Sequence, residues 1–123
     1  ETAAESLVLL DACFSGFTKS GSALASTKGV VKLTSGAPRG NTVVLSAASS
    51  NEVAHQYEEK SHGLFTYYLL KQLQETQGNT TLGELFTYVE KQVVRTSLTV
   101  IRKSQTPSAA AGPNAQAWRD RNL

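Results

Sequence analysis

The stretch Leu7-Val8-Leu9-Leu10-Asp11-Ala12-Cys13-Phe14-Ser15-Gly16 decides how this chain folds. It begins with a run of large apolar residues and then passes to polar residues and a glycine. This pattern is typical of a buried, parallel β-strand. Because ligands and reacting groups collect at the carboxyl edge of an open α/β sheet, the residues that follow this strand are the first candidates for a functional site.

The chain has a single cysteine, Cys13, which lies just beyond this strand. A single cysteine cannot form an internal disulfide, so Cys13 is either a small buried hydrophobe or a nucleophile. Composition alone favours the buried hydrophobe. However, Asp11 lies two residues earlier, and strand alternation points both side chains to one side. Because an unpaired carboxylate is costly to bury, this neighbour favours a cleft in which Asp11 selects a basic substrate for Cys13.

Length and composition limit the fold and its partners. The 123 residues are enough for one small domain with a real core. A net charge of +2 gives no sign of nucleic-acid binding, and no apolar run reaches the roughly 18 residues of a transmembrane helix. We therefore expect neither a nucleic acid nor a membrane as a partner. The absence of methionine and the short segment before the strand lead us to expect that Glu1 is a cut end, and that another chain or an upstream segment completes the sheet.

Residues 14–41 form a long connection rich in glycine, serine and threonine. Connections of this length inside a compact domain are usually functional or disordered. The basic residues of this connection have no acidic neighbours to offset them. We keep two interpretations, a solvated loop and a linker cleaved by a protease with a basic preference. The candidate processing sites are Lys19, Lys28, Lys32 and Arg39.

The patterns after this connection predict a second strand and a helix. Residues 42–47 are β-branched and apolar on both faces, which indicates another buried strand. A polar run follows it, as one follows the first strand. Apolar residues then recur at helical spacing, which predicts a helix over about 62–76 with Ser61 as its N-cap.

A second helix is predicted from Thr81 to about Thr96, where Thr81 and Glu84 form a capping box. Its apolar stripe consists of Leu82, Leu85, Phe86, Val89 and Val93. An alanine-rich piece after Pro107 predicts a final edge strand, and the polar residues 113–123 predict a loosely held tail. The order of strands and helices suits a fragment of a three-layer α/β fold.

Several of these segments resemble the caspase-like cysteine peptidases. Residues 9–16 are similar to the segment that carries the catalytic cysteine, and most similar to the segment in metacaspases, paracaspases and bacterial orthocaspases, which have Asp two residues before the Cys. Caspases proper have Gln at that position. One short motif would be weak evidence, but the likeness continues in the expected order across most of residues 5–110. The further matching segments are residues 44–49, 62–70, 81–85 and 105–107.

The resemblance implies that residues 1–112 are the C-terminal part of a three-layer α/β/α caspase-like domain, incomplete in this chain, and that the activity is that of a Cys–His endopeptidase. Cys13 would be the nucleophile, and its backbone N–H would contribute to the oxyanion hole. Asp11 would lie in the S1 pocket and favour Arg, and then Lys, at P1.

The resemblance implies a second, weaker set of substrate-binding residues. Glu52 aligns with an acidic S1 residue of paracaspases. Metacaspases often place acidic residues one or two positions earlier, where this chain has Ser50 and Asn51. Ser46 and Ser50 are further candidates. Some metacaspases need calcium, but this chain has no dense cluster of oxygen ligands, so we expect no metal unless residues outside the chain supply the site.

The catalytic histidine of the family lies roughly 50 residues before the cysteine, and so before Glu1. Of the two histidines present, we expect His55 to be a surface residue and His62 to be structural. The chain should therefore need an upstream, His-bearing chain of the same polypeptide as its partner. Its substrates would be peptides with a basic P1 residue, and the assembled enzyme would be a monomer, as is typical of metacaspases and orthocaspases.

Two other interpretations remain open at this stage. The first is a catalytically inactive, caspase-like scaffold or regulatory domain, in which Cys13 would be inert. The second is a flavodoxin-like binding module that contains Asp-Ala-Cys by chance. That module would need a phosphate-binding glycine loop that opens directly into a helix, and no convincing helix follows Gly16.

Overall fold

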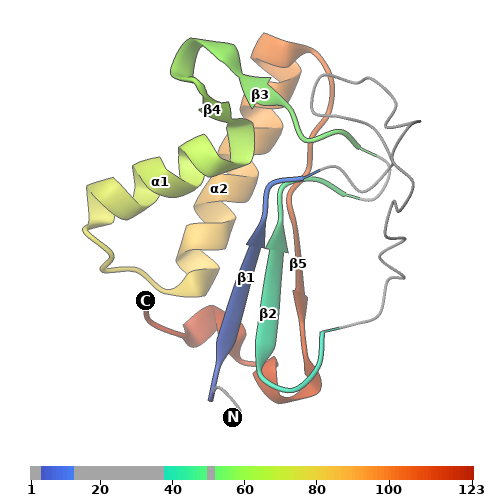
Figure 1. The fold of residues 1–123 in the computed structure, drawn as a ribbon. Helices are drawn as coiled ribbons and strands as arrows, with labels where there is room; N and C mark the ends of the chain where they lie inside the picture. Colours follow the sequence, from blue (N-terminus) through green and yellow to red (C-terminus); the bar gives the residue numbers. More distant parts are fainter. Residues whose placement is uncertain (1–3, 13–37, 50–51) are drawn as a thin grey trace.

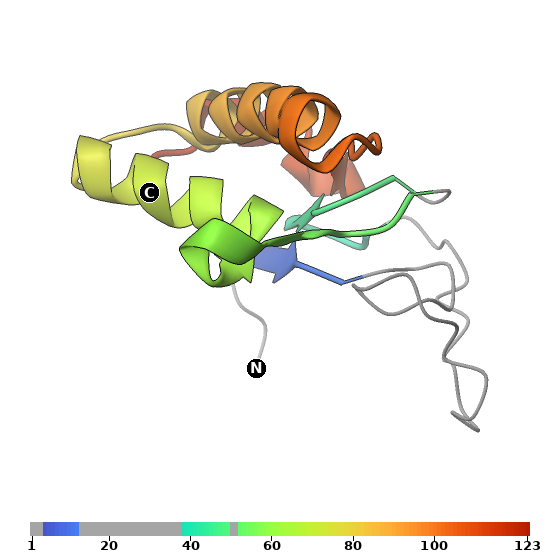
Figure 2. The same ribbon diagram turned by 90° about the horizontal axis from the view of Figure 1, so that it is seen from above.

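The computed structural model describes residues 4–12, 38–49 and 52–123, in which a three-stranded sheet carries two helices on one face (Figures 1 and 2). The helices in these ranges are too short or too polar to cross a lipid bilayer. The elements in chain order are β1 (Ser6–Leu10), β2 (Thr42–Ser46), β3 (Gln56–Tyr57), the 3₁₀ turn η1 (Glu58–Lys60), β4 (His62–Gly63), α1 (Leu64–Thr76), α2 (Leu82–Thr96), the π-helical turn η2 (Ser97–Ile101), β5 (Ser108–Ala111), and the 3₁₀ turns η3 (Pro113–Ala115) and η4 (Trp118–Asp120).

The sheet has the order β1-β2-β5. Strands β1 and β2 are parallel and in register from Ser6 opposite Thr42 to Leu10 opposite Ser46. Strand β5 runs antiparallel along the other side of β2. The α/β class, the parallel pair and the final edge strand are therefore confirmed. The described residues supply the sheet and one helical layer, which is two layers of the predicted three-layer fold.

Strand β1 is less buried than its sequence predicts. The side chains of Leu7, Val8 and Leu9 are 38%, 37% and 42% exposed. Within the described part of the chain β1 pairs only with β2, so its outer edge lies at the border of the sheet (Figure 1). An apolar strand of this kind is expected to be covered on both faces. The prediction of a buried strand is thus wrong for this chain taken by itself.

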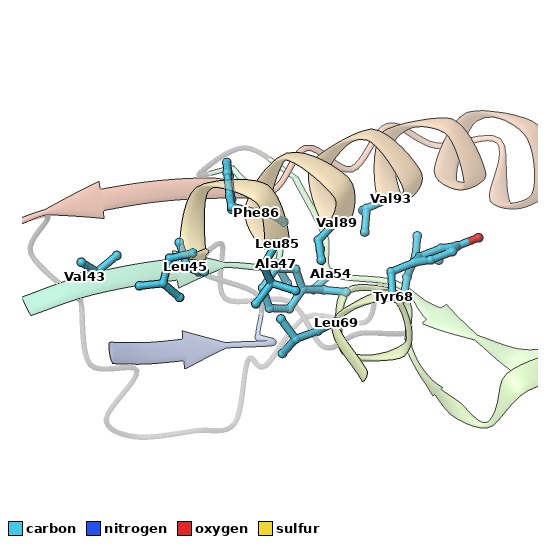
Figure 3. Packing of buried hydrophobic residues seen from close by; sticks show 14 of the residues in the cluster. Val43, Leu45, Ala47, Ala54, Tyr68, Leu69, Leu85, Phe86, Val89 and Val93 are labelled. Carbon is cyan, nitrogen blue, oxygen red and sulfur yellow. The ribbon is translucent and has the colours of Figure 1, made fainter. Parts of the chain in front are cut away.

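Helix α2 and strand β2 form the core. The Thr81 hydroxyl accepts a hydrogen bond from the backbone N–H of Glu84 at 3.1 Å, which confirms Thr81 as the N-cap. Every residue of the predicted apolar stripe is buried. This stripe packs over Val43 and Leu45 of β2 (Figure 3). The helix ends at Thr96, as predicted.

Helix α1 begins two residues later than predicted, and Ser61 does not cap it. Ser61 has φ 56° and ends the short turn η1, while Gly63 is the N-cap of α1. His62 and Gly63 pair with Gln56 and Tyr57 in a small hairpin instead. The tertiary pairing of this hairpin therefore sets the start of the helix.

The C-terminal residues pack against the domain, so the prediction of a loose tail is wrong. Trp118 is only 9% exposed and meets Phe86 of α2 edge to face, with ring centroids 6.0 Å apart. The backbone N–H of Leu82 donates to the carbonyl of Arg121 at 2.8 Å. A polar composition conceals this contact, because only two residues of the segment, Ala115 and Trp118, are apolar and buried.

Candidate active site

The carboxyl ends of β1 and β2 lie side by side, at the edge where the sequence places the candidate site. Beyond the last strand pair, the backbone N–H of Ala47 still donates to the carbonyl of Leu10 at 2.8 Å. Asp11 follows directly on one strand, and the loop that begins at Ala47 follows on the other. The predicted residues Cys13, Ser50, Lys19, Lys28 and Lys32 lie outside the described residues.

The Asp11 carboxylate is held by the first turn of helix α1. Its Oδ2 accepts a hydrogen bond from the Thr66 hydroxyl at 2.5 Å and a longer one from the Thr66 backbone N–H at 3.4 Å. The N-cap of this helix, Gly63, has no side chain to accept such a bond. Asp11 therefore acts as an N-cap supplied from another element, at the end of the helix where the macrodipole favours negative charge.

Sequence reasoning did not identify Thr66. The usual signal for a helix cap is a polar residue just before the helix, and Gly63 stands there. The acceptor instead comes from a residue 55 positions earlier. A helix whose N-cap is glycine, together with an acidic residue at the end of a strand, is the signal in the sequence that could have suggested this pair.

Glu52 is held by a different part of the chain. Its Oε1 accepts hydrogen bonds from the backbone N–H of Thr106 at 2.7 Å and of Ser49 at 3.3 Å, and its Oε2 accepts one from the Thr106 hydroxyl at 3.3 Å. Burial by itself raises the pKa of Glu52, but these hydrogen bonds and one from Ser104 outweigh it and lower the pKa below its ordinary value. The carboxylate therefore fastens the loop after β2 to the segment before β5.

Gln105 completes this connection from inside the core. It is fully buried, its Nε2 donates to the carbonyl of Ala47 at 2.8 Å, and its Oε1 accepts from the backbone N–H of His55 at 2.8 Å. Its own backbone N–H donates to the Ser97 hydroxyl at 3.1 Å. The sequence presents Gln105 only as part of a motif, and its contribution to the site depends on these long-range contacts.

The structure places the other candidate residues in positions less suited to substrate binding or catalysis. Ser46 is 9% exposed at the end of β2, and most of its surface is therefore closed to a substrate. His62 is exposed in β4. His55 is half-buried, and its pKa is lowered by burial and by the charge of Lys103, against the opposing effect of Glu52. Within residues 4–12, 38–49 and 52–123, no three His, Cys, Asp or Glu side chains are grouped so that they could hold a metal ion.

Arg39, the predicted processing site that falls within the described residues, is exposed but lies in a tight turn. Its carbonyl accepts from the backbone N–H of Thr42 at 3.2 Å, and the next residue, Gly40, has φ +58°. The carbonyl of Gly40 accepts from the N–H of Asn114 at 3.0 Å. The peptide bond after Arg39 is therefore held within the turn, and the next peptide bond, Gly40–Asn41, is fastened to the C-terminal segment of the domain.

A comparison with models of known protein families identifies the family of this chain. The family model of the caspase domain matches residues 2–116, a range that contains every strand and both helices described above. No match was found to a curated protein or to a solved structure. The matched range also contains Asp11, Glu52 and Gln105, the residues that organise the carboxyl edge of the sheet. The chain therefore belongs to the caspase domain family of cysteine peptidases.

Proposed function

We propose that this chain is the cysteine-bearing part of an endopeptidase that cleaves after Arg, and less readily after Lys. The position of Asp11 carries the proposal. It lies at the carboxyl end of β1, two residues before Cys13, with its carboxylate directed by Thr66. Asp at this position is also the feature that likens the chain to metacaspases, paracaspases and orthocaspases rather than to caspases proper.

The chemistry requires a thiolate and a proton donor. A cysteine with a pKa of about 8.5 is only a few per cent ionised at neutral pH, so a histidine must assist it. In the proposed reaction the Cys13 sulfur attacks the scissile carbonyl carbon, and the histidine takes the thiol proton and delivers it to the leaving amine. Water then cleaves the thioester and releases the acid, while backbone N–H groups stabilise the oxyanion of each tetrahedral intermediate.

We assign recognition of the P1 residue to Asp11 rather than to Glu52. A guanidinium pairs best with a carboxylate that offers both oxygens in its plane, which favours Arg over Lys. Both oxygens of Glu52 already accept hydrogen bonds, from Thr106 and Ser49. This supports a role for Glu52 in shaping the loop after β2.

The exposed strand β1 supports the proposal that a further segment, bearing the catalytic histidine, completes the enzyme. The outer edge of β1 presents backbone N–H and C=O groups that a neighbouring strand would pair. The exposed side chains of Leu7, Val8 and Leu9 alternate between the two faces of the sheet, and the rest of such a segment would cover them. We propose that this segment is an upstream part of the same polypeptide, either continuous with the chain or separated from it by processing.

Active-site labelling tests the proposal. The native protein, with every chain that copurifies with it, is treated with an arginyl chloromethyl ketone and its intact mass is measured under denaturing conditions. We expect one adduct on the chain that carries Cys13. The adduct should be lost in Cys13→Ala and absent with the aspartyl analogue.

Two comparisons decide how the result is interpreted. Asp11→Asn should slow arginyl labelling at least about tenfold, since it removes a charge-assisted contact, and should leave alkylation of Cys13 by iodoacetamide nearly unchanged. If a second, His-bearing chain is present and no adduct forms, the peptidase proposal fails and the chain is an inactive scaffold.

A further inference from the structure

We infer that Thr66 is a positioning residue for the P1 specificity of this enzyme, because it fixes the direction of the Asp11 carboxylate. The inference rests on the proposed function and extends it to a residue on helix α1. Two donors of Thr66, its hydroxyl and its backbone N–H, converge on the same oxygen, Oδ2 of Asp11. Together they restrict the rotation of the carboxylate about its side-chain bonds.

The start of helix α1 is a rigid support for this contact. Leu64 and Phe65, the two residues before Thr66, are 0% and 1% exposed, and Tyr68 and Leu69 are buried in the following turn. The Tyr68 hydroxyl is also hydrogen-bonded to the Thr96 hydroxyl of α2, with 2.7 Å between the oxygens. Thr66 therefore cannot move without displacing core residues, and its hydroxyl holds Asp11 in a fixed place relative to the sheet.

The direction of the carboxylate matters because a guanidinium recognises it in a plane. A bidentate pair needs the two carboxylate oxygens to face the guanidinium edge, and a rotated carboxylate makes a single, weaker bond. An ammonium group is a point charge and tolerates rotation better. Loss of the Thr66 hydroxyl should therefore weaken binding of P1-Arg substrates more than binding of P1-Lys substrates.

The experiment compares Thr66→Val with Thr66→Ser in the native protein. Valine keeps the shape of threonine but removes the donor, whereas serine keeps the donor. Cleavage of matched P1-Arg and P1-Lys peptides is measured, with enzyme concentrations set by titration of the reactive Cys13. Thr76→Val is the matched control, since its hydroxyl donates to the Gln72 carbonyl at 2.8 Å near the other end of the same helix.

We expect Thr66→Val to raise KM for the P1-Arg peptide about tenfold, the effect of losing one hydrogen bond to a charged group, while kcat changes less than about threefold. KM for the P1-Lys peptide should rise less. Thr66→Ser and Thr76→Val should behave like the parent protein. If Thr66 only stabilised the fold, Thr66→Val would lower the melting temperature but leave KM for both peptides unchanged.

The possible failures are distinguishable. If Thr66→Val keeps the parent KM for P1-Arg, or if Thr66→Ser is as impaired as Thr66→Val, the inference about Thr66 is overturned and the proposed peptidase stands. If the parent protein neither cleaves the P1-Arg peptide nor reacts with the arginyl chloromethyl ketone, the proposed function fails and the inference fails with it.

Discussion

Gln105 and Ala47 are joined by a hydrogen bond of 2.8 Å from the side-chain Nε2 to the backbone carbonyl, in the interior of the domain. The same amide accepts from the backbone N–H of His55. One side chain thus satisfies a backbone acceptor at the start of the loop after β2 and a backbone donor at its end. Since buried backbone groups need partners, this glutamine holds Ala47 and His55 in place at the two ends of the loop.

Gln105→Leu should reduce the free energy of unfolding by about 2–4 kcal/mol, because it leaves a carbonyl and an N–H without their partners in the interior. Denaturant unfolding of the native protein measures the change. Gln116→Leu provides the control, since Gln116 is exposed and makes a single 3.2 Å bond to the Gly112 carbonyl. Equal stability changes in the two variants would contradict the role given to Gln105.

In Glu52→Gln the free energy of unfolding should depend less on pH in the acid range. The folded-state pKa of Glu52 is lowered below 4.5, so its contribution is present above its unfolded-state pKa and is lost as pH falls through the folded-state pKa. At pH 7 the variant should be less stable by about 1 kcal/mol, from weakened bonds to Thr106 and Ser49. Unfolding titrations at several pH values should show this difference shrinking below about pH 4. A difference that is constant with pH would refute the assignment.

Gly112→Ala should loosen the turn that holds Arg39. A Cβ at position 112 would lie 2.3 Å from the Gly40 carbonyl oxygen and 2.8 Å from the Arg39 carbonyl carbon, both backbone atoms that cannot step aside. In the parent protein we expect trypsin to spare the Arg39–Gly40 bond, because its backbone is hydrogen-bonded and turned. In the variant, cleavage there should accelerate at least about threefold. This increase corresponds to a decrease of less than about 1 kcal/mol in the free energy needed to open the turn locally.

Mass spectrometry of timed tryptic digests checks this prediction. Gly78→Ala is a suitable control, since a Cβ there meets open space and strains only a residue with φ +78° far from Arg39 in sequence. Rapid cleavage after Arg39 in the parent protein would instead restore Arg39 as a processing site in the folded state.

Trp118→Ala should destabilise the domain by about 3 kcal/mol, a value typical of removing a buried aromatic side chain. Trp118→Phe should recover part of this loss, because it keeps an edge-to-face partner for Phe86. Thermal unfolding followed by circular dichroism distinguishes the variants. If Trp118→Ala melts like the parent protein, residues 113–123 are not part of the folded unit.

Patterns confined to one element predicted the fold well. The stripe of α2 and its Thr81 cap are confirmed, because each depends on periodicity or capping within a few residues. The parallel pair of β1 and β2 and the final edge strand are also confirmed, because the strands are marked by local apolar runs and the order of strands and helices favours this pairing. The start of α1 was missed because its first residues are fixed by pairing between His62 and Tyr57. The packing of Trp118 was missed for the same reason, since its partner Phe86 lies on another element.

The candidate site could be located from the sequence, but its internal contacts could not. Asp11 and Glu52 follow two strands whose carboxyl ends meet, so their neighbourhood is predictable from topology alone. Which donors hold them is decided by contacts across 54 and 55 positions of sequence. No local pattern marks Thr66 or Thr106 as the partners, because a surface threonine in either place would have the same sequence context.

The cap that Asp11 provides for α1 constrains how the specificity of this enzyme can be redesigned. Replacing Asp11 with a basic residue, to accept acidic P1 groups, would reverse the charge beside the positive end of the helix and leave the N–H and hydroxyl of Thr66 without their acceptor. A variant with altered selectivity would therefore have a less stable first turn of α1. Directed evolution toward a new P1 preference should first select second substitutions that stabilise the start of α1, and only then efficient variants.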